Sequence, residues 1–546
     1  MTRKILIIAA LIFAYGCSDH QYNTDITLGT HDYDVIVYGN SSAAITAAIS
    51  AARNGVNVLI ISENNHLGGL TTSGLTATDL NSYLHVGGIS KEFYHRIYNE
   101  YLKPELWKYE DRSSYFDRSK ERTYSGKNDK MKMQWVFESN VASQVFNSML
   151  LEENVAIKYN SPIKSVIKYD KKIERIILQT GDSLSAENFI DASYGGDLMA
   201  LADVAYTIQR ESKETYGENY AGFDHLRNYP VVMDSTTIDP YIEKGVPASG
   251  FLPYLNDGDN INGQSVASKT QAYCYRLTLT DYLENRKEIE KPIDYDPLLY
   301  EYLIRRIQKD TTAVTLKNIF TITPMPNFKT DTNGIDFVGG NEGWVNGSYK
   351  ERIEIERLHK TFTIGLIWFL QNDERVPHAL KREVSKWGFA KDEFINNENF
   401  PPQLYIRESR RMIGDYVMTE QNCSGKKIAN KSIGYGTYAI DSHVVQRIVF
   451  NGKVLEEGHF YKKMGNYQID YDALVPKRSQ CSNLFVPICL SSSHVAYGSI
   501  RMEPVFMILG HSVGTAAAIC SKYDVSPKDL KYNVLKKQLL RENQIL

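Results

Sequence analysis

Cysteine is scarce in this 546-residue chain, and its spacing gives no sign of a cysteine-based site. No two of the six cysteines form a C-x-x-C pair, so neither a zinc knuckle nor an iron–sulfur run can be read from the sequence, and we predict no metal site. The cysteines beyond residue 17 are odd in number, which leaves at least one free thiol. They are Cys274, Cys423, Cys481, Cys489 and Cys520.

Neither acidic nor basic residues are in large excess: the chain has 62 Lys and Arg and 65 Asp and Glu. The formal net charge is −3, which gives no support for a nucleic-acid partner. The sequence has no repeats and no low-complexity tract, and 42% hydrophobic with 23% charged residues is ordinary for a globular protein. A chain of this length is too long for one simple core, so we expect two domains or one large fold with an insertion.

A short apolar run near the N-terminus predicts export. The basic "MTRK" precedes "ILIIAALIFA", which is too short to span a bilayer as a mature anchor, and Cys17 follows. The pattern resembles a bacterial lipobox, although Ala14 stands where leucine is usual; the alternative is plain secretion with Cys17 incidental. We predict a lipoprotein signal peptide over 1–17 and a polar tether over 18–31. The protein would then be exported and held at the cell envelope, on its periplasmic or outer-membrane face, by a lipid on Cys17.

Glycine is sparse where a nucleotide-binding loop is expected. A strand over 33–38, a helix over about 43–54 and a strand over 56–62 predict a βαβ unit, and Gly55 follows the helix as a C-cap glycine does. In "YGNSSAA" the positions of a G-x-G-x-x-G pattern are Gly39, Ser41 and Ala44. Ser41 is the main departure, and it is compatible with a phosphate only if its φ need not be positive.

The second strand of the unit ends without the usual acidic residue. A carboxylate that binds ribose hydroxyls is expected there, but Ser62 ends the strand and Glu63 follows. Either Glu63 serves with a shifted register or the ribose is bound otherwise. The candidate nucleotide-binding residues of the unit are Gly39, Ser41, Ser42, Ala44 and Glu63.

Two further turns are rich in small residues. "HLGGLTTSG" contains the Gly68–Gly69 doublet followed by Ser73 and Gly74. "FIDASYGGDLMA" is a strand that ends at Asp191, with Ser193 in the turn. Because small residues let the backbone lie close to a flat ligand, we expect these residues to contact a cofactor.

The rest of the chain divides into three stretches. "VAIKYN", "IKSVIKYD", "KIERIILQT" and "SLSAENFIDAS" read as strands of an antiparallel meander, and 213–430 is helical and loop-rich. The end returns to an apolar strand over 483–490 and a helix with small residues on one face, as expected for a helix packed closely on a sheet or a cofactor. We predict an α/β nucleotide-binding domain made of 32–212 and 431–546, with an inserted α+β substrate or cap domain over 213–430.

The most specific blocks are "HLGGLTTSGL", "FIDASYGGDLMA", "QAYCYRLTLT", "QLYIRESRRMIGDYVMTE", "DSHVVQR" and "SSHVAYGSIRMEPVFMILGHSVGTAAA". With these blocks the chain resembles, from about 34 to 522, the FAD-dependent oxidoreductases common in Bacteroidetes and related bacteria. That family is similar in its FAD domain to the glutathione-reductase-like superfamily. It usually has a further glycine at the position of Asn40, and often glycine at Ala44 and glutamate at Ser62. The resemblance implies a Rossmann-like FAD-binding domain and FAD as cofactor, which we expect to be bound non-covalently.

Histidine is the expected catalytic base. In the superfamily the last helix points its N-terminus at the flavin; here that end is "AYGSIRMEP", where Gly498 and Ser499 are expected to approach the ring. Hydride transfer from an alcohol or amine carbon needs a base, which histidine provides near neutral pH. His494, just after the apolar strand, is the first candidate and His443 the second; a hydrogen-bonded packing role is the alternative for both.

Three arginines form the remaining candidate cluster. Arg407, Arg410 and Arg411 share one face if their segment is a helix. Such a cluster clamps a carboxylate or phosphate, or forms internal ion pairs with Glu408 and Asp415. We include Arg407 among the candidate catalytic residues and expect two of the three arginines to be structural.

Together these features predict an exported, membrane-tethered FAD-dependent oxidoreductase. It would transfer a hydride between FAD and a small molecule, which the resemblance suggests is sugar-derived, and its electron acceptor is not identified. The alternative is a carbohydrate-binding lipoprotein that keeps the flavoprotein fold without the flavin; its only support is the glycine-poor first loop. An NAD-dependent dehydrogenase is disfavoured by the Gly68–Gly69 segment and by export.

Overall fold

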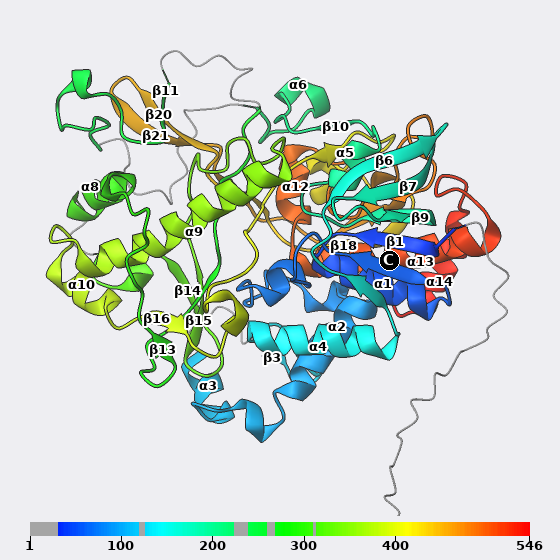
Figure 1. Cartoon of the computed structure of the whole chain (residues 1–546), viewed down its shortest axis with the longest axis horizontal. Helices are drawn as coiled ribbons and strands as arrows, with labels where there is room; N and C mark the ends of the chain where they lie inside the picture. Colours follow the sequence, from blue (N-terminus) through cyan, green and yellow to red (C-terminus); the bar gives the residue numbers. More distant parts are fainter. Residues whose placement is uncertain (1–30, 120–125, 223–237, 259–267, 310–312) are drawn as a thin grey trace, which may run out of the picture.

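A computed structural model of the chain describes residues 31–119, 126–222, 238–258, 268–309 and 313–546 (Figure 1). The predicted signal peptide, Cys17 and the predicted tether up to residue 30 lie outside these residues. All five described cysteines are buried free thiols.

A parallel five-stranded sheet organises the first domain. Its strand order is β24-β9-β1-β2-β5, and β1 pairs with β2 and with β9 in parallel register. The sheet is apolar along whole strands, as in Val35–Val37, because both of its faces are covered. The predicted βαβ unit is confirmed. The strands are β1 (Tyr33–Tyr38), β2 (Val58–Ile61), β5 (Ala156–Lys158), β9 (Ala186–Asp191) and β24 (Leu484–Phe485).

The antiparallel meander is smaller than the sequence predicted. It has three strands, β6 (Ile163–Tyr169), β7 (Lys172–Leu178) and β8 (Ser183–Leu184). The flanking β5 and β9 are wrongly included in it by the sequence pattern, because both join the parallel sheet. Short strands of similar composition do not reveal whether their partner is a neighbour in sequence or a distant strand, and that pairing is set by the tertiary fold.

Two helices pack closely against each other over this sheet. They are α1 (Ser42–Arg53) and α13 (Glu503–Tyr523), the small-residue helix. A Cβ added to Gly510 would lie 2.3 Å from the carbonyl oxygen of Ala43, and one added to Gly514 would lie 2.2 Å from that of Ala47. The small residues of α13 therefore allow close contact with α1. By length and composition α13 also passes as a candidate membrane span, but 94% of its most apolar window is buried inside the protein, as in a core helix.

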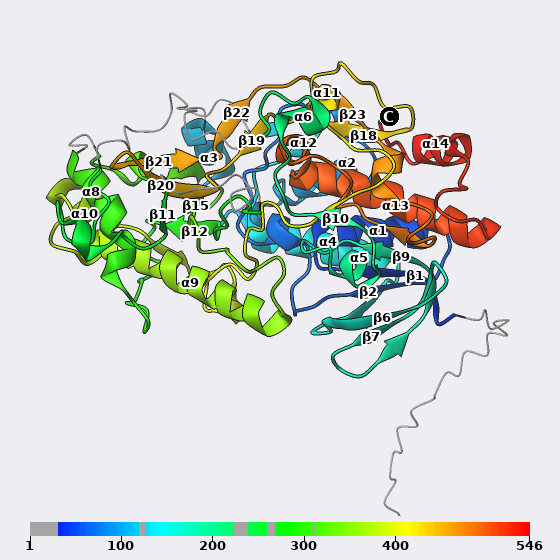
Figure 2. The same ribbon diagram turned by 90° about the horizontal axis from the view of Figure 1, so that it is seen from above.

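The greater part of the described cap (213–430) lies at the opposite end of the molecule from α14 (Tyr532–Arg541) and from β6 and β7 (Figures 1 and 2). Its five-stranded sheet has the order β13-β16-β12-β15-β14 and is antiparallel throughout. The strands are β12 (Leu277–Thr280), β13 (Arg286–Lys287), β14 (Thr321–Pro324), β15 (Lys329–Asn333) and β16 (Gly388–Ala390). The helices are α8 (Glu301–Lys309), α9 (Tyr349–Asn372) and α10 (His378–Val384).

A strand pairing links the cap to the C-terminal stretch of the chain. The strand β11 (Leu255–Asp257) pairs with β20 (Gln446–Phe450), which pairs with β21 (Lys453–Glu457). One strand beyond residue 430, β20, thus pairs with the inserted segment, and β21 joins the same sheet through β20.

The other elements complete the first domain and its junction with the cap. The helices are α2 (Gly88–Glu100), α3 (Arg112–Arg118), α4 (Ser139–Glu152), α5 (Asp197–Leu201), α6 (Lys213–Tyr216), α11 (Glu420–Cys423), α12 (His494–Ile500) and α14 (Tyr532–Arg541). The strands are β3 (Lys127–Asn128), β4 (Met133–Gln134), β10 (Tyr206–Thr207), β17 (Arg411–Met412), β18 (Ser432–Gly436), β19 (Ile440–Ser442), β22 (Phe460–Lys462) and β23 (Tyr467–Asp470).

Candidate active site

The three turns of small residues meet at the carboxyl ends of β1, β2 and β9. Gly39 has φ +127°, and a Cβ added there would lie 2.4 Å from the carbonyl carbon of Ala192. Gly69 has φ +54°, and its added Cβ would lie 2.2 Å from the hydroxyl oxygen of Tyr194. The missing side chains let the turns pack on one another, and the sequence correctly grouped these turns around one place.

The N-terminus of α1 offers unpaired donors at this place. The backbone N–H groups of residues 40–43 have no hydrogen-bond acceptor among the described residues, and the first turn carries no acidic side chain. Asn40 is fully buried, and its Oδ1 also has no partner. Buried N–H groups at a helix N-terminus fit an anionic group such as a pyrophosphate.

Ser41 satisfies the condition that the sequence left open. It has φ −71° and ψ 169°, a conformation that any residue adopts. Its hydroxyl accepts from the N–H of Ala44 at 3.2 Å and donates to the carbonyl of Ala192 at 2.6 Å. The serine therefore caps α1 without strain, and its own N–H stays available.

Glu63 is the second residue after β2, close to where an acidic residue is expected. The hydroxyl of Ser62 donates to the carbonyl of Asn64 at 2.8 Å, so Ser62 belongs to the turn. Burial raises the pKa of Glu63, and the carboxylate of Asp197 raises it further. The hydroxyl of Tyr349, on α9 of the cap, donates to the carbonyl of Glu63 at 3.2 Å. The cap thus reaches the turn that would contact a ribose.

Asp191 and Ser193 shape the turn after β9. The Asp191 carboxylate accepts from the hydroxyl of Ser193 at 2.6 Å and from the N–H of Met199 at 2.7 Å. Burial raises the pKa of Asp191 to about 6. The polar atoms of this pair serve the turn and fix its conformation.

The turn that contains Gly68 and Gly69 ends against the cap. Gly68 has φ +96° and precedes η1 (Gly69–Thr72). The hydroxyl of Ser73 accepts from the N–H of Gln403 at 2.9 Å. A Cβ added to Gly74 would lie 2.0 Å from the carbonyl oxygen of Arg276, beside the cap strand β12. These residues join the cap to the turns.

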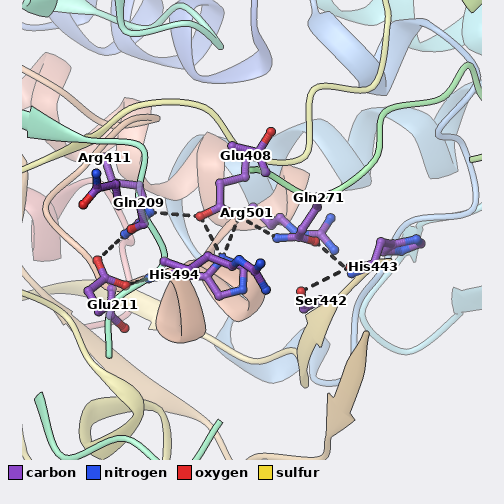
Figure 3. A network of polar contacts seen from close by, with 12 residues as sticks. Gln209, Glu211, Gln271, Glu408, Arg411, Ser442, His443, His494 and Arg501 are labelled. Atoms are coloured by element: carbon purple, nitrogen blue, oxygen red, sulfur yellow. Dashed lines mark hydrogen bonds and ion pairs between the residues drawn. The ribbon is translucent and has the colours of Figure 1, made fainter. Parts of the chain in front are cut away.

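His494 stands at the first position of α12, in a buried polar network (Figure 3). Its Nδ1 lies 2.8 and 3.0 Å from the two carboxylate oxygens of Glu408. The same carboxylate accepts from Nε of Arg411 at 2.9 Å and from Nε2 of Gln271 at 3.0 Å. Nε2 of His494 has no hydrogen-bond partner among the described residues.

The protonation of Glu408 follows from its partners. Burial by itself would raise its pKa, but His494 and Arg411, with a hydrogen bond from Gln271, hold it at about 2. An ionised carboxylate only accepts hydrogen bonds, so Nδ1 of His494 carries the proton of this contact, and in the neutral imidazole Nε2 is the acceptor nitrogen. This is the tautomer that a general base requires.

His443 is joined to the same network. Its backbone N–H donates to Oε1 of Gln271 at 3.0 Å. Its Nδ1 lies 2.6 Å from Oδ2 of Asp336, and its Nε2 lies 3.5 Å from Oδ2 of Asp441. Both ring nitrogens of His443 therefore face carboxylates, whereas Nε2 of His494 has no hydrogen-bond partner among the described residues.

Arg407 fixes one of these carboxylates. It is fully buried, and its NH2 lies 2.8 Å from Oδ1 of Asp336 and 3.2 Å from Sγ of Cys274. Its guanidinium also lies 4.5 Å from the ring centroid of Tyr405. The three predicted catalytic residues are thus brought into one network, in which Arg407 holds Asp336 in place.

Similarity to known proteins identifies the family of this chain. A family model described as FAD dependent oxidoreductase matches residues 34–539. The chain belongs to the FAD-dependent oxidoreductase family. FAD is its cofactor, and the family match gives no support to the flavin-free alternative.

Individual relatives are distant or cover little of the chain. The vinyl phenol reductase of Lactiplantibacillus plantarum is 44% identical over 62 residues, which are 11% of this chain and 12% of that protein. The bacillithiol disulfide reductase of Staphylococcus aureus is 13% identical, with a TM-score of 0.17 over 34% of this chain and 42% of its own. The 3-ketosteroid-Δ4-(5α)-dehydrogenase of Rhodococcus jostii RHA1 is 14% identical, with a TM-score of 0.18 over 33% and 50%.

In this FAD-dependent oxidoreductase, the open donors of residues 40–43 would hold the pyrophosphate of FAD, and Glu63 its ribose. The Ser42 side chain is committed elsewhere, since its hydroxyl donates to Glu503 at 2.7 Å. Ala44 is buried in the first turn of α1, where its N–H is capped by Ser41. Their part in FAD binding stays a prediction.

The other two arginines form internal ion pairs. Their segment is not a helix; only Arg411 and Met412 are regular, as strand β17. Arg410 bonds the carboxylate of Asp197 at 2.8 Å, and Arg411 bonds Glu211 at 2.6 Å as well as Glu408. The expected partner Asp415 lies instead 3.1 Å from Lys528. The i, i+4 spacing misled because it is informative only inside a helix.

Gly498 and Ser499 lie in α12, ahead of the start of α13. A Cβ on Gly498 would lie 3.0 Å from the carbonyl oxygen of Asp441. The Ser499 hydroxyl donates to the carbonyl of Tyr438 at 2.7 Å. Helix α13 begins at Glu503, and Pro504 follows in its first turn. The approach of Gly498 and Ser499 to the flavin stays a prediction.

Sequence reasoning missed the residues that connect the histidines. Gln271 lies in the block "QAYCYRLTLT", which marked the segment but not the residue. Asp441 lies in the block "DSHVVQR", which likewise marked the segment but not the residue. Asp336 and Glu211 carried no local signal, since acidic residues usually face solvent.

Proposed function

We propose that this flavoenzyme transfers a hydride between FAD and a hydroxyl-bearing carbon of a small molecule, with His494 as the base. The observation that supports it is the side chain of the buried residue His494, whose Nε2 has no hydrogen-bond partner among the described residues while its Nδ1 is held by an ionised Glu408. FAD, when bound, supplies the acceptor for the hydride. Nε2 takes the proton that leaves the hydroxyl, and Glu408 stabilises the resulting imidazolium.

His443 and its carboxylates would orient the substrate. Asp336 and Asp441 accept hydrogen bonds from hydroxyl groups, and the His443 side chain is 20% exposed. Several carboxylates beside one histidine suit a polyhydroxylated molecule, which supports a sugar-derived substrate. The electron acceptor that reoxidises FAD stays unidentified.

The base is tested by bleaching of the flavin absorbance at about 450 nm in the purified protein under anaerobic conditions. A panel of sugars, hydroxy acids and amino acids first supplies a reducing substrate. His494→Asn should keep the yellow colour but slow bleaching by about 10²- to 10⁴-fold.

Two controls make that experiment decisive. His378→Asn, at an exposed position on α10, should bleach at the wild-type rate. Wild-type bleaching rates in His494→Asn would remove the base assignment, and a panel that never bleaches wild-type protein would count against hydride transfer itself.

We also propose that the flavin is bound without a covalent link and that the protein is exported and lipid-anchored. Acid precipitation should leave FAD in the supernatant; colour in the pellet would contradict this. In the expressing bacterium, Cys17→Ala should move the protein from the membrane fraction to the soluble fraction, because a lipid chain supplies the membrane affinity. An unchanged distribution would disprove the anchor.

A further inference from the structure

A cavity inside the cap shares a wall with the candidate active site. It has a volume of about 140 Å³ and lies between β11, α8, α9, β20 and the end of β15. Apolar and aromatic side chains form most of its lining, among them Tyr254, Tyr302, Leu303, Phe337, Phe362 and Leu366.

Its size and shape fit a single ring. An apolar protein cavity of about 150 Å³ stays dry and binds benzene. Aromatic rings dominate one side of the cap cavity: Phe337 is stacked on Phe362 at 4.0 Å between centroids and makes a T-shaped contact with Tyr254 at 4.8 Å. Such an aromatic lining favours contact with another ring.

One end of the cavity is charged. Asp336 and Arg447 both line it. Asp336 bonds His443 at 2.6 Å and Arg407 at 2.8 Å, so its carboxylate belongs at once to the cavity and to the histidine network. Arg447 lies 4.4 Å from the ring centroid of Tyr302 and bonds Glu456 at 3.0 Å. A ligand ring in the cavity would therefore have a hydrogen-bond acceptor, Asp336, at its polar edge.

We propose that this cavity is a substrate subsite for one aromatic or alicyclic ring that carries a hydroxyl group. The ring packs against the aromatic lining of the cavity, and its hydroxyl donates to Asp336, which places the ring beside His443. The substrate is then a sugar derivative or other alcohol with a ring substituent, in preference to a free sugar. The assignment of the ring to the substrate rests on the proposed function; the binding of the ring does not.

Binding is measured on the FAD-loaded protein by calorimetry with three probes: phenol, toluene and glucose. Phenol should bind most tightly and glucose should not occupy the cavity. In Asp336→Asn the preference for phenol over toluene should fall about tenfold, because the charged acceptor is lost. An unchanged preference would remove Asp336 from the subsite.

A filling variant locates the probe. Leu303→Trp, on the half-buried face of α8, should abolish phenol binding, while Leu283→Trp, at a position that is 71% exposed and away from the cavity, should not. The flavin spectrum and near-UV circular dichroism check that both variants are folded, and Leu366→Trp repeats the test from α9. Equal phenol binding in the filled and control variants would overturn the proposal.

Failure here is distinguishable from failure of the proposed function. If no compound bleaches FAD but phenol binds and Leu303→Trp blocks its binding, the proposal of hydride transfer is wrong and the proposal of a ring-binding site is supported. If a substrate that bleaches FAD is found and phenol does not compete with it, the proposal of hydride transfer is supported and the assignment of the cavity as a substrate subsite is wrong.

Discussion

The interface of α1 and α13 and the network around Glu408 are both buried, yet different forces hold them. At the helix interface, the backbones of α1 and α13 lie against each other at Gly510 and Gly514, so that even one added side-chain carbon has no room. In the network, the Glu408 carboxylate bonds Arg411, His494 and Gln271, so the stability of this region depends on the charge of that carboxylate. We expect the α1–α13 interface to tolerate substitutions that change charge nearby but not the addition of a methyl group. We expect the Glu408 network to tolerate substitutions that change side-chain shape but not the loss of a charge.

The largest expected effect is loss of the central charge. Glu408→Ala leaves His494 without its anion and Arg411 with Glu211 alone, and breaking a buried ion pair costs about 3–5 kcal/mol. Urea unfolding followed by circular dichroism measures the free energy of unfolding. The matched control is Glu354→Ala, because Glu354 pairs with Arg357 on the surface, with side chains 58% and 57% exposed. Equal unfolding midpoints for the two variants would contradict the comparison.

Acid should weaken the network next. The pKa of Glu408 is held at about 2 in the folded state against an ordinary value of 4.5. Its stabilisation is therefore complete above about pH 4.5 and is lost as pH falls towards 2, by about 3 kcal/mol in all. Thermal unfolding of wild type and Glu408→Gln between pH 5 and 3 measures this. The difference between the two proteins should shrink as pH falls, and a constant difference would exclude the ionised carboxylate.

A methyl group should disturb the helix interface by a smaller amount. Gly514→Ala places a Cβ 2.2 Å from the carbonyl oxygen of Ala47, and overpacking of this kind costs about 1–3 kcal/mol. Gly465→Ala, where an added Cβ meets nothing within 4 Å, is the control. Denaturant midpoints of the two variants should separate; if they coincide, the helices have more room than the structure indicates.

The smallest effect is expected at the loop that departs from the glycine pattern. Ser41 has φ −71°, which any residue adopts, so replacing it with glycine would not make available a backbone conformation that the loop requires. Ser41→Gly loses only the cap hydroxyl, so its dissociation constant for FAD should stay within about threefold of wild type. Fluorescence titration of flavin-stripped protein measures this. A tenfold tighter complex would mean that serine impairs the loop.

The sequence predicted the parts of the fold that depend on neighbours along the chain. The βαβ unit, Gly55 after α1 and Pro504 at the start of α13 all follow from local propensity and capping, and the structure has each of them. The pairing of β5 and β9 with the parallel sheet could not be read, because strand composition does not name a partner.

By itself, then, the sequence determined the FAD-binding architecture and the three turns that meet in it, since small residues at fixed positions leave a physical signature in the chain. Only the tertiary structure decided which of the two candidate bases, His443 or His494, has a ring nitrogen without a hydrogen-bond partner among the described residues. That difference arises because Glu408, Gln271 and Asp336 lie far apart in sequence and come together through folding, and the protonation of each histidine depends on the charges that face it.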